Sequence, residues 1–594
     1  MVTLLGWAAL AGLVCSSGTS SITTSTPPNC TAIHGFSFPE SESLPDAHRT
    51  AIQSAAGCCS ACESTDQCFT WTWHPSNGCW LHGALGPHPN AVRCGDGAAC
   101  TTGSSSRCTL PPIPPPGPPP VPPSPPPPPL RTLAKPSIAH LRFHEDNVGA
   151  IAHFGMQTYI PFGERKCNCE NGPCSWPASQ FNPVKLDTDN WVGAAAAWGA
   201  KYFVLVADHF SGFSLWPTAV HNYSVAGSPW RSGKGDVVAD FITSCKKYGI
   251  RPAVYYSVHA NWHEGVCSFN LSNASAQRAF EDLAITQLTE LAQKYGSDLA
   301  EVWFDAGVKQ SIEFVARVNT WAKATLPTTA TCHSCQNLPD VSAVSWMGNE
   351  NTVMPYPVWN ANDEQCSFSG NPKRGYGDPS GSRWCPAHCD AVLRRHFWFW
   401  NNGAYNSSTN LNTETDLLRM HMTSVGRGCN MILDMSPTDT GLLEPIDSAT
   451  YAAFGRGLES LYHGTVVAGN VSGIPGARVI EVESAVGGIT RGAFEIREDL
   501  ASGQAIMNYT VEFCSKTPCD DGYVPLLLRN GPGLTVGNRR IHFWDKTTVG
   551  ALRISVTTLK LETGPAPAHI RSLTLFDWSS ASLDSLITGI LTLE

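Results

Sequence analysis

The sequence predicts an α/β fold built around a parallel barrel, with smaller parts on either side. Between residues 137 and 460, short apolar runs alternate with amphipathic segments, the pattern of strands and helices around a parallel sheet. Residues 30–108 are dense in cysteine, and residues 465–594 carry short strand-like runs between Gly- and Pro-rich turns. We therefore expect a (β/α)8 TIM-like barrel over 137–460, a C-terminal β-sandwich over 465–594 and a small disulfide-rich N-terminal module over 30–108.

The composition limits the classes of partner. The chain of 594 residues is 42% hydrophobic and 15% charged, and it has a formal net charge of −10 with no basic tract. Nucleic-acid-binding surfaces are basic, so we expect no nucleic acid partner. No stretch has the ~20 consecutive apolar residues that a transmembrane helix needs, so we expect no membrane partner.

The N-terminus predicts export. Residues 1–20 hold a short apolar core from Leu4 to Val14 followed by small residues, which is typical of a signal peptide, although a basic start is missing. Removing Cys15 with this segment leaves 22 of the 23 cysteines, an even number that favours disulfides in an oxidising compartment. Asn-x-Ser/Thr acceptor sites recur along the chain. We expect a secreted glycoprotein of the extracellular space or cell wall, with lysosome or vacuole as alternatives.

The cysteine-rich module is expected to be stapled by disulfides. Its cysteines are Cys30, Cys58, Cys59, Cys62, Cys68, Cys79, Cys94, Cys100 and Cys108. Zinc binding at Cys59-x-x-Cys62 is the alternative, but no second paired spacing follows. The runs GCCSAC at 57–62, CFTWTW at 68–73 and GCWL at 78–81 resemble PAN/Apple domains. That resemblance implies a protein or carbohydrate ligand. The alternative is a disulfide-linked spacer that binds no ligand.

Residues 109–131 form a proline-rich linker. Such a tract adopts extended polyproline II, a stiff spacer of ~3.1 Å per residue. Its Ser-Pro run from Ser124 resembles extensin-like wall glycoproteins. The linker is expected to hold the module away from the barrel.

The first half of the barrel is predicted to contain four strands and three helices. The strands are expected at 149–155, 202–208, 252–257 and 299–307, and the helices at 187–198, 236–248 and 276–295. Asp187 can cap the first helix, and Gly249 and Gly296 can end the other two. The second half is less regular, with strands expected at 328–331, 341–347, 397–400 and 430–434.

The tail is expected to form the sandwich. Residues 479–482 and 552–556 are predicted strands, and Cys514 and Cys519 are close enough in sequence to pair.

Polar residues gather at the predicted strand ends, which share one mouth in a parallel barrel. They are His153, Asp208, His209, Tyr255, Asp305 and Glu350. Two carboxylates among histidines and aromatic residues suit glycoside hydrolysis. Aromatic rings that could stack on a sugar are those of Trp176, Trp216, Trp262 and Trp303. The simpler explanations are that Asp305 caps the next helix, and that the His and Trp residues pack in the core.

Several motifs together resemble the α-L-fucosidases of glycoside hydrolase family 29, in their plant-type branch. They are HFGM at 153–156, FSLWPT at 213–218, SPW at 228–230, GKGDVV at 233–238, EVWFD at 301–305, WMGNE at 346–350, GRGCN at 426–430 and TVGNRRIH at 535–542. The resemblance runs in order from about 137 to 580.

The resemblance implies a role for each matching residue. Asp305 would be the nucleophile and Glu350 the acid/base. His153 and His209 would hold sugar hydroxyls, Trp216 and Tyr255 would shape the pocket, and Glu164 would match an acidic sugar-contact position. No metal and no cofactor is implied.

Three departures weaken the prediction of the sugar. Where the family usually has Lys-His-His after the second strand, this chain has Asp208-His209-Phe210, and a Glu of plant-type relatives is replaced by His388. Losing a hydrogen-bond partner of a hydroxyl can change discrimination by orders of magnitude. The cysteines of Cys167-x-Cys169-x4-Cys174 could bind a metal, but disulfides are the simpler expectation.

We therefore expect a secreted, retaining exo-α-L-fucosidase that removes terminal α-L-fucose from oligosaccharides, glycoproteins or wall polysaccharides. One alternative is a glycosidase for another sugar. The other is an inactive carbohydrate-binding wall protein.

Overall fold

The computed structural model describes residues 132–578, apart from 162–174, 268–273, 297–298, 306, 309–310, 333–334, 336–337, 339–340, 348–349, 351, 363–375, 404, 406–407, 463–464, 470–478, 485–487 and 567–568. It also describes the backbone of strands between residues 31 and 104. The chain divides into two compact units, Met1–Pro127 and Pro128–Glu594. The expected signal segment, the linker, Glu164 and the cysteines at 167–174 lie outside the described residues.

The first unit contains antiparallel strands. Five of them form one sheet in the order β1-β7-β4-β5-β3, and β2 pairs with β6. Their bounds are β1 Thr31–His34, β2 Phe36–Ser37, β3 Ser43–Arg49, β4 Thr70–His74, β5 Gly78–His82, β6 Val92–Arg93 and β7 Thr101–Ser104. The cysteine side chains of this unit are outside the described part of the chain, so its disulfides stay a prediction.

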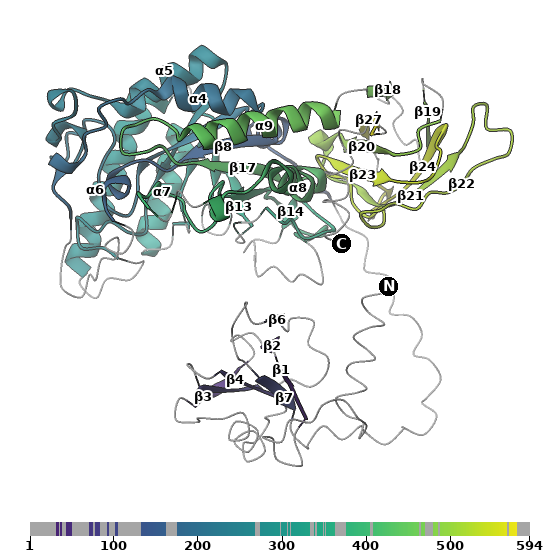
Figure 1. Ribbon diagram of the computed structural model, residues 1–594, viewed down its shortest axis with the longest axis horizontal. Coiled ribbons are helices and arrows are strands. Elements are labelled where there is room, and N and C mark those ends of the chain that lie inside the picture. The colour runs from purple at the N-terminus through teal and green to yellow at the C-terminus, as the bar shows by residue number, and fades with distance from the viewer. Residues whose placement is uncertain are drawn as a thin grey trace. The chain divides into compact units, whose positions relative to one another are not determined.

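In the second unit, eight parallel strands close into a barrel (Figure 1), and this confirms the (β/α)8 prediction. The order around the barrel is β10-β11-β12-β13-β16-β17-β8-β9. The bounds are β8 Val148–Ala152, β9 Tyr202–Asp208, β10 Arg251–Tyr256, β11 Glu301–Trp303, β12 Ala330–Cys332, β13 Ser342–Trp346, β16 Ala387–Ala391 and β17 Asn430–Met435.

Helices accompany the strands. They are α3 Ile138–Asp146, α4 Thr188–Ala197, α5 Val237–Tyr248, α6 Ala274–Tyr295, α7 Ile312–Thr325, α8 Glu414–Ser424 and α9 Pro445–Tyr462. Helix α5 illustrates how the sequence sets their bounds. The Asp236 carboxylate accepts a hydrogen bond from the Ala239 N–H at 2.9 Å, and Gly249 ends the helix at φ 69°, a conformation that glycine adopts at little cost.

Strand alternation separates the barrel interior from the helix-facing layer. In β9, Val204 and Val206 belong to the interior cluster, whereas Phe203 and Leu205 pack in the larger core that includes the helices. Phe143 on α3, a helix that the sequence analysis did not predict, joins the interior cluster. The same alternation decides which polar side chain at each strand end reaches the barrel mouth.

The prediction of strand seven was wrong. The strand is β16, Ala387–Ala391, and not 397–400. The apolar-run criterion missed it because His388, Cys389 and Asp390 occupy its centre, all buried. Cys389 is outside the interior cluster and forms a disulfide with Cys429, the residue before β17. A second disulfide joins Cys335 to Cys385.

The tail forms two four-stranded antiparallel sheets, as predicted for a β-sandwich. The sheet orders are β18-β27-β20-β23 and β19-β24-β21-β22. The bounds are β18 Thr465–Gly469, β19 Val479–Glu483, β20 Gly492–Glu498, β21 Ile506–Cys514, β22 Val524–Pro525, β23 Arg540–Trp544, β24 Ala551–Thr558 and β27 Ile570–Asp577. The short strands β14 Ala361–Asn362, β15 Arg383–Trp384, β25 Lys560–Leu561 and β26 Gly564–Pro565 form two further pairs. The expected Cys514–Cys519 disulfide is confirmed.

The sandwich packs directly on the barrel domain, beside α8 and the end of α9 (Figure 1). The Trp578 indole N–H donates to the Leu461 carbonyl of α9 at 2.8 Å. Arg540 on β23 is buried, and its guanidinium donates to the Gly426 carbonyl after α8 at 3.1 Å.

Not every cysteine is used in a disulfide, because Cys245 on α5 keeps a free, buried thiol. Among the described helices, none combines the length and apolarity needed to cross a bilayer.

Candidate active site

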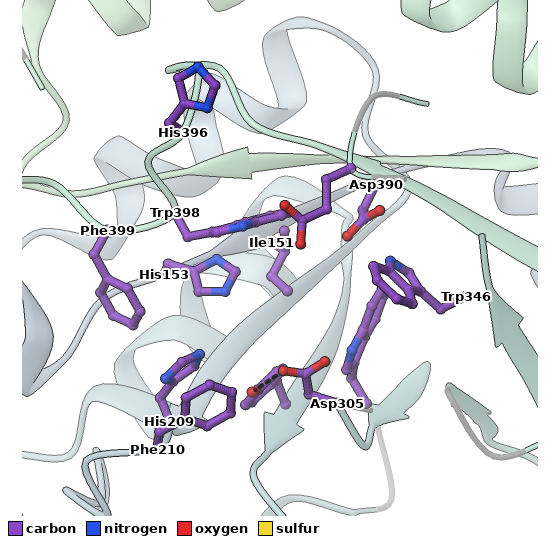
Figure 2. A pocket seen from close by; sticks show the side chains of 13 residues that line it. Ile151, His153, His209, Phe210, Asp305, Trp346, Asp390, His396, Trp398 and Phe399 are labelled. Carbon is purple, nitrogen blue, oxygen red and sulfur yellow. Dashed lines mark hydrogen bonds between the residues drawn. The ribbon is translucent and has the colours of Figure 1, made fainter. Parts of the chain in front are cut away.

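A cavity of about 380 Å³ lies where the barrel strands end (Figure 2). This volume is in the range of small-ligand sites. Its lining residues are Ile151, His153, His209, Phe210, Tyr255, Trp303, Asp305, Trp346, Glu350, Asp390, His396, Trp398 and Phe399. Of the expected site residues, the structure brings together Asp305, Glu350, His153, His209 and Tyr255.

Asp305 follows β11 by two residues and is held by Tyr255 from the neighbouring strand β10. The Tyr255 hydroxyl donates a hydrogen bond to Asp305 Oδ2 at 3.0 Å, drawn as a dashed line in Figure 2. Burial, and then the negative charge of Asp305, raise the pKa of Tyr255 above its usual range, so the phenol keeps its proton. Asp305 does not cap the following helix, because the Ser311 hydroxyl accepts from the Phe314 N–H in that position. Its carboxylate is therefore presented to the cavity.

His153 is oriented by a buried carboxylate. Its Nδ1–H donates to Asp434 Oδ1 at 2.6 Å, and the Ser436 hydroxyl donates to Asp434 Oδ2 at 2.9 Å. Burial raises the pKa of Asp434, and the contact with His153 opposes that rise. With Nδ1 engaged, Nε2 is the ring nitrogen left to face a ligand. Asp434 was not predicted as a site residue, although a charge ending the apolar strand at 430–434 was an available signal.

His209 is oriented by an amide. The Gln157 Nε2 donates to His209 Nδ1 at 2.9 Å, and Gln157 Oε1 in turn accepts from the Ser211 hydroxyl at 3.1 Å. A neutral ring that accepts at Nδ1 carries its hydrogen on Nε2. The His209 ring also stacks on Tyr255 with 5.3 Å between centroids. This histidine can thus act as a hydrogen-bond donor towards a ligand hydroxyl.

Glu350 and Asp390 bring two more carboxyl groups to the same cavity. Glu350 follows β13 and is exposed, and its backbone is in the left-handed region at φ 49°. A non-glycine residue held there costs of order 1 kcal/mol or more, and such residues cluster at functional sites. Asp390, near the end of β16, is 6% exposed. Burial raises its pKa to about 7, and the charges of Glu350 and Asp305 add to that rise.

Aromatic rings form much of the wall. Trp398 and Phe399 lie against His153, with ring centroids 4.9 and 5.2 Å away. These two residues belong to the segment wrongly predicted as strand seven, which instead forms part of the loop after β16. The wall offers apolar surface beside the three carboxyl groups, an arrangement that suits the two faces of a sugar ring.

The family model described as Alpha-L-fucosidase matches residues 132–460, more than half of the chain. The chain belongs to the α-L-fucosidase family. An Arabidopsis thaliana relative named Alpha-L-fucosidase 1 is 30% identical over 340 residues, 56% of this chain and 61% of the relative. A rice (Oryza sativa subsp. japonica) relative is 31% identical over 358 residues, 58% of this chain and 64% of the relative. The matched regions therefore span less than two thirds of these relatives.

Solved structures of the family share the fold of this α-L-fucosidase family member. A Bacteroides thetaiotaomicron protein assigned to the α-L-fucosidases is 27% identical with a TM-score of 0.63, and the match covers 75% of this chain and 99% of that one. A Ruminococcus gnavus GH29 fucosidase in complex with fucose is 20% identical with a TM-score of 0.61, over 76% and 96% of the two chains. The second likeness shows the fold alone.

The residues that depart from the family pattern do not all lie in the cavity wall. Phe210 lines the cavity and meets the His259 ring edge-on at 4.6 Å. Asp208 is absent from the lining, because its carboxylate accepts from the Ser214 hydroxyl at 2.8 Å, and Ser214 in turn accepts from Gln287 on α6. Of these two departures, only Phe210 changes the cavity wall directly.

The structure corrects the prediction for Trp216. It was expected to shape the sugar pocket, but it is fully buried and is not among the lining residues. Its indole N–H donates to Glu290 Oε2 on α6 at 3.1 Å, so it packs in the helix layer. Trp176 and Trp262 contact each other at 5.9 Å and are also absent from the lining.

His388, the third departure, lies inside the barrel and outside the cavity lining. Its Nε2 donates to both oxygens of Glu301 at 2.7 and 2.9 Å, and its Nδ1 accepts from the Tyr202 hydroxyl at 3.2 Å. Among the described residues, Glu301, Cys332 and His388 place ligand atoms within 4.8 Å of one another. The geometry is that of an internal hydrogen-bonded pair, because the Glu301 carboxylate and His388 satisfy each other.

Proposed function

We propose that this protein is a secreted, retaining exo-α-L-fucosidase, with Asp305 as the nucleophile and Glu350 as the acid/base. The observation that carries the proposal is that Asp305, hydrogen-bonded by Tyr255, shares one cavity with Glu350 in a chain of the α-L-fucosidase family. An exo-acting enzyme needs a pocket that encloses one terminal sugar, and a cavity of about 380 Å³ is of that scale.

In the first step, Asp305 attacks the anomeric carbon while Glu350 protonates the leaving glycosidic oxygen, so that the bond from this carbon to that oxygen breaks. In the second step, Glu350 takes a proton from water, and the water oxygen displaces Asp305 from the same carbon. Two inversions give overall retention, which requires carboxyl groups ~5–5.5 Å apart. The Tyr255 hydrogen bond stabilises Asp305 as the anion before attack and as the leaving carboxylate in the second step.

The wall residues suit L-fucose, a 6-deoxy sugar. His153 and His209, each fixed through Nδ1, offer their Nε2 atoms to ring hydroxyls. Phe210, Trp398 and Phe399 offer apolar surface to the methyl group and to the apolar face of the ring.

Export and substrate class are part of the same proposal. The signal-like segment, the cysteine usage and the proline-rich linker support an extracellular or wall-located enzyme that acts on fucosylated oligosaccharides, glycoproteins or wall polysaccharides. We propose that the N-terminal unit is a PAN/Apple-like module that binds carbohydrate or protein. Binding of wall glycans to the enzyme with and without residues 30–131 would test that role.

The decisive experiment is trapping with a 2-fluorinated fucosyl donor, followed by peptide mapping. The expected result is a covalent label on Asp305, no label in Asp305→Asn, and slow turnover of the label in Glu350→Gln. A label on another carboxyl group, or NMR evidence of an inverted product, would overturn the assignment.

A second candidate function is a glycosidase for a different sugar, favoured by Phe210 in the wall. A panel of chromogenic α- and β-glycosides separates the two candidates. Faster turnover of another glycoside than of α-L-fucoside would favour the second.

A further inference from the structure

Asp390 occupies a special position in the strand that the sequence analysis missed. Along β16, His388 points into the barrel interior, Cys389 points outward to its disulfide, and Asp390 returns to the interior side one layer nearer the mouth. Figure 2 shows its side chain beside the cavity with that of Trp346. Parallel barrels build their active sites at this end of each strand.

The Asp390 carboxyl group is only half satisfied. The Trp346 indole donates a hydrogen bond to it, which fixes its orientation. Its Oδ1 is buried and has no hydrogen-bond partner among the described residues. A buried polar atom without a partner is costly, commonly about 1–3 kcal/mol, unless something else supplies the bond. In a cavity wall, a ligand is the natural source of that bond.

The neighbouring charges define what kind of bond Asp390 can make. Glu350 and Asp305 both act on it electrostatically, and burial acts more strongly, so its pKa rises to about 7. Below that pH the group is mainly the neutral acid, which can donate or accept a hydrogen bond. A neutral carboxyl group can therefore bind a hydroxyl without adding a third negative charge next to Asp305 and Glu350.

We propose that Asp390 is a third functional carboxyl group of this cavity, and that its Oδ1 hydrogen-bonds to a hydroxyl of the sugar that Asp305 attacks. This inference rests on the proposed function, because it assigns a contact within the same site. The rival role is purely structural, in which Asp390 only holds Trp346 in place.

Two variants of the full chain separate these roles. Asp390→Leu removes the polar group, whereas Asp390→Asn keeps an acceptor for Trp346 and an N–H donor for the sugar. With an aryl α-L-fucoside at pH 5.5, Asp390→Leu is expected to lose at least about 100-fold in kcat/KM, because a buried bond to a hydroxyl is lost. Asp390→Asn should stay within about tenfold of the wild type, and it should lose the alkaline fall in kcat/KM near pH 7.

A series of monodeoxy fucosides, each lacking one hydroxyl, separates a contact with the sugar from a purely structural role. A structural role would lower kcat/KM equally for every member of the series. For the fucoside lacking the contacted hydroxyl, wild type and Asp390→Leu should have nearly equal kcat/KM. Glu301→Gln is the matched control, since that carboxyl group is buried in the same barrel but does not line the cavity. It should change all deoxy fucosides by a common factor. The inference is overturned if Asp390→Leu keeps wild-type kcat/KM, or if its loss is equal for every deoxy fucoside.

The failure of the proposed function would look different. If the wild type cleaved no α-L-fucoside but cleaved another glycoside, the deoxy series of that sugar would replace the fucosides in the same comparison. If it cleaved none, L-fucose titration by tryptophan fluorescence would decide, with Asp390→Leu expected to weaken binding at least tenfold. Equal binding by the two proteins, or no binding by either, would overturn the inference.

Discussion

His153 and Asp434 are joined by a 2.6 Å hydrogen bond at the seam where the first and last barrel strands meet. Both side chains are buried, at 6% and 1% exposure. The bond connects residues 281 positions apart in the sequence, so it forms only when β8 and β17 close the barrel. It makes the orientation of a cavity histidine depend directly on barrel closure.

Asp434→Asn should lower kcat/KM by about 10- to 100-fold with a smaller fall in melting temperature. An amide can present either its oxygen or its nitrogen to His153, so the ring loses its fixed tautomer and orientation, and small misplacements of catalytic-site groups are costly. Steady-state kinetics on an aryl α-L-fucoside measure the loss. Ser436→Ala, which removes only one bond to Asp434, should have a weaker effect. Wild-type kinetics in Asp434→Asn would contradict this role.

Tyr255→Phe should lower kcat by about 10- to 100-fold without a large change in stability. The change removes one hydrogen bond to a charged carboxylate, typically about 1.5–3 kcal/mol, while the ring and its packing remain. Tyr256→Phe is the matched control, because the Tyr256 hydroxyl bonds to Gln287 in the helix layer at 2.7 Å. That variant should affect unfolding more than turnover, and the reverse pattern would refute the assignment.

His144 should make the protein less stable as the pH falls below about 6.5. Burial lowers its folded-state pKa from 6.5 to about 3, so the unfolded chain binds the extra proton first, and stability is lost between these values. From pH 7 to pH 5 the loss is about 2 kcal/mol. His144→Gln keeps an acceptor for the Trp384 indole N–H and should remove this part of the pH dependence.

Urea denaturation of both proteins at pH 5 and pH 7 measures the His144 contribution. The difference between wild type and variant isolates this residue, since Asp208 and Asp390, whose pKa values are raised, titrate in both proteins. Parallel pH dependences in the two proteins would show that His144 does not contribute.

Phe210→Ala should raise KM for an aryl α-L-fucoside by about tenfold and leave kcat within a few-fold. The ring supplies apolar contact surface to the bound sugar, worth about 1.5 kcal/mol, and is remote from the bond that breaks. Phe210→Leu keeps apolar bulk and should raise KM less. An unchanged KM in both variants would mean that Phe210 does not contact the sugar.

The polar residues of the seventh barrel strand account for most of the errors in the predicted fold. Apolar character identified the strands that are apolar up to their last residue, such as 202–208, nearly to the residue. It failed at Ala387–Ala391, because burial inside a barrel is compatible with His388 and Asp390 when other strands supply their partners. The aromatic run at 397–400 was read as a strand for the same reason, since apolar character alone does not separate a strand from a cavity wall.

The residues themselves determined the barrel, the sandwich, the Cys514–Cys519 disulfide and the family, because periodicity, turn residues and short motifs are local properties. They also placed Asp305 and Glu350 at strand ends. Only the tertiary structure decided that Trp216 lies outside the pocket and donates to Glu290, and that Asp208 accepts from Ser214 instead of lining the cavity. It also decided that Asp390 lines the cavity. The first two outcomes depend on partners that folding brings together, 74 positions away for Trp216 and 6 for Asp208. The outcomes for Asp208 and Asp390 also depend on the side of the strand that each residue occupies.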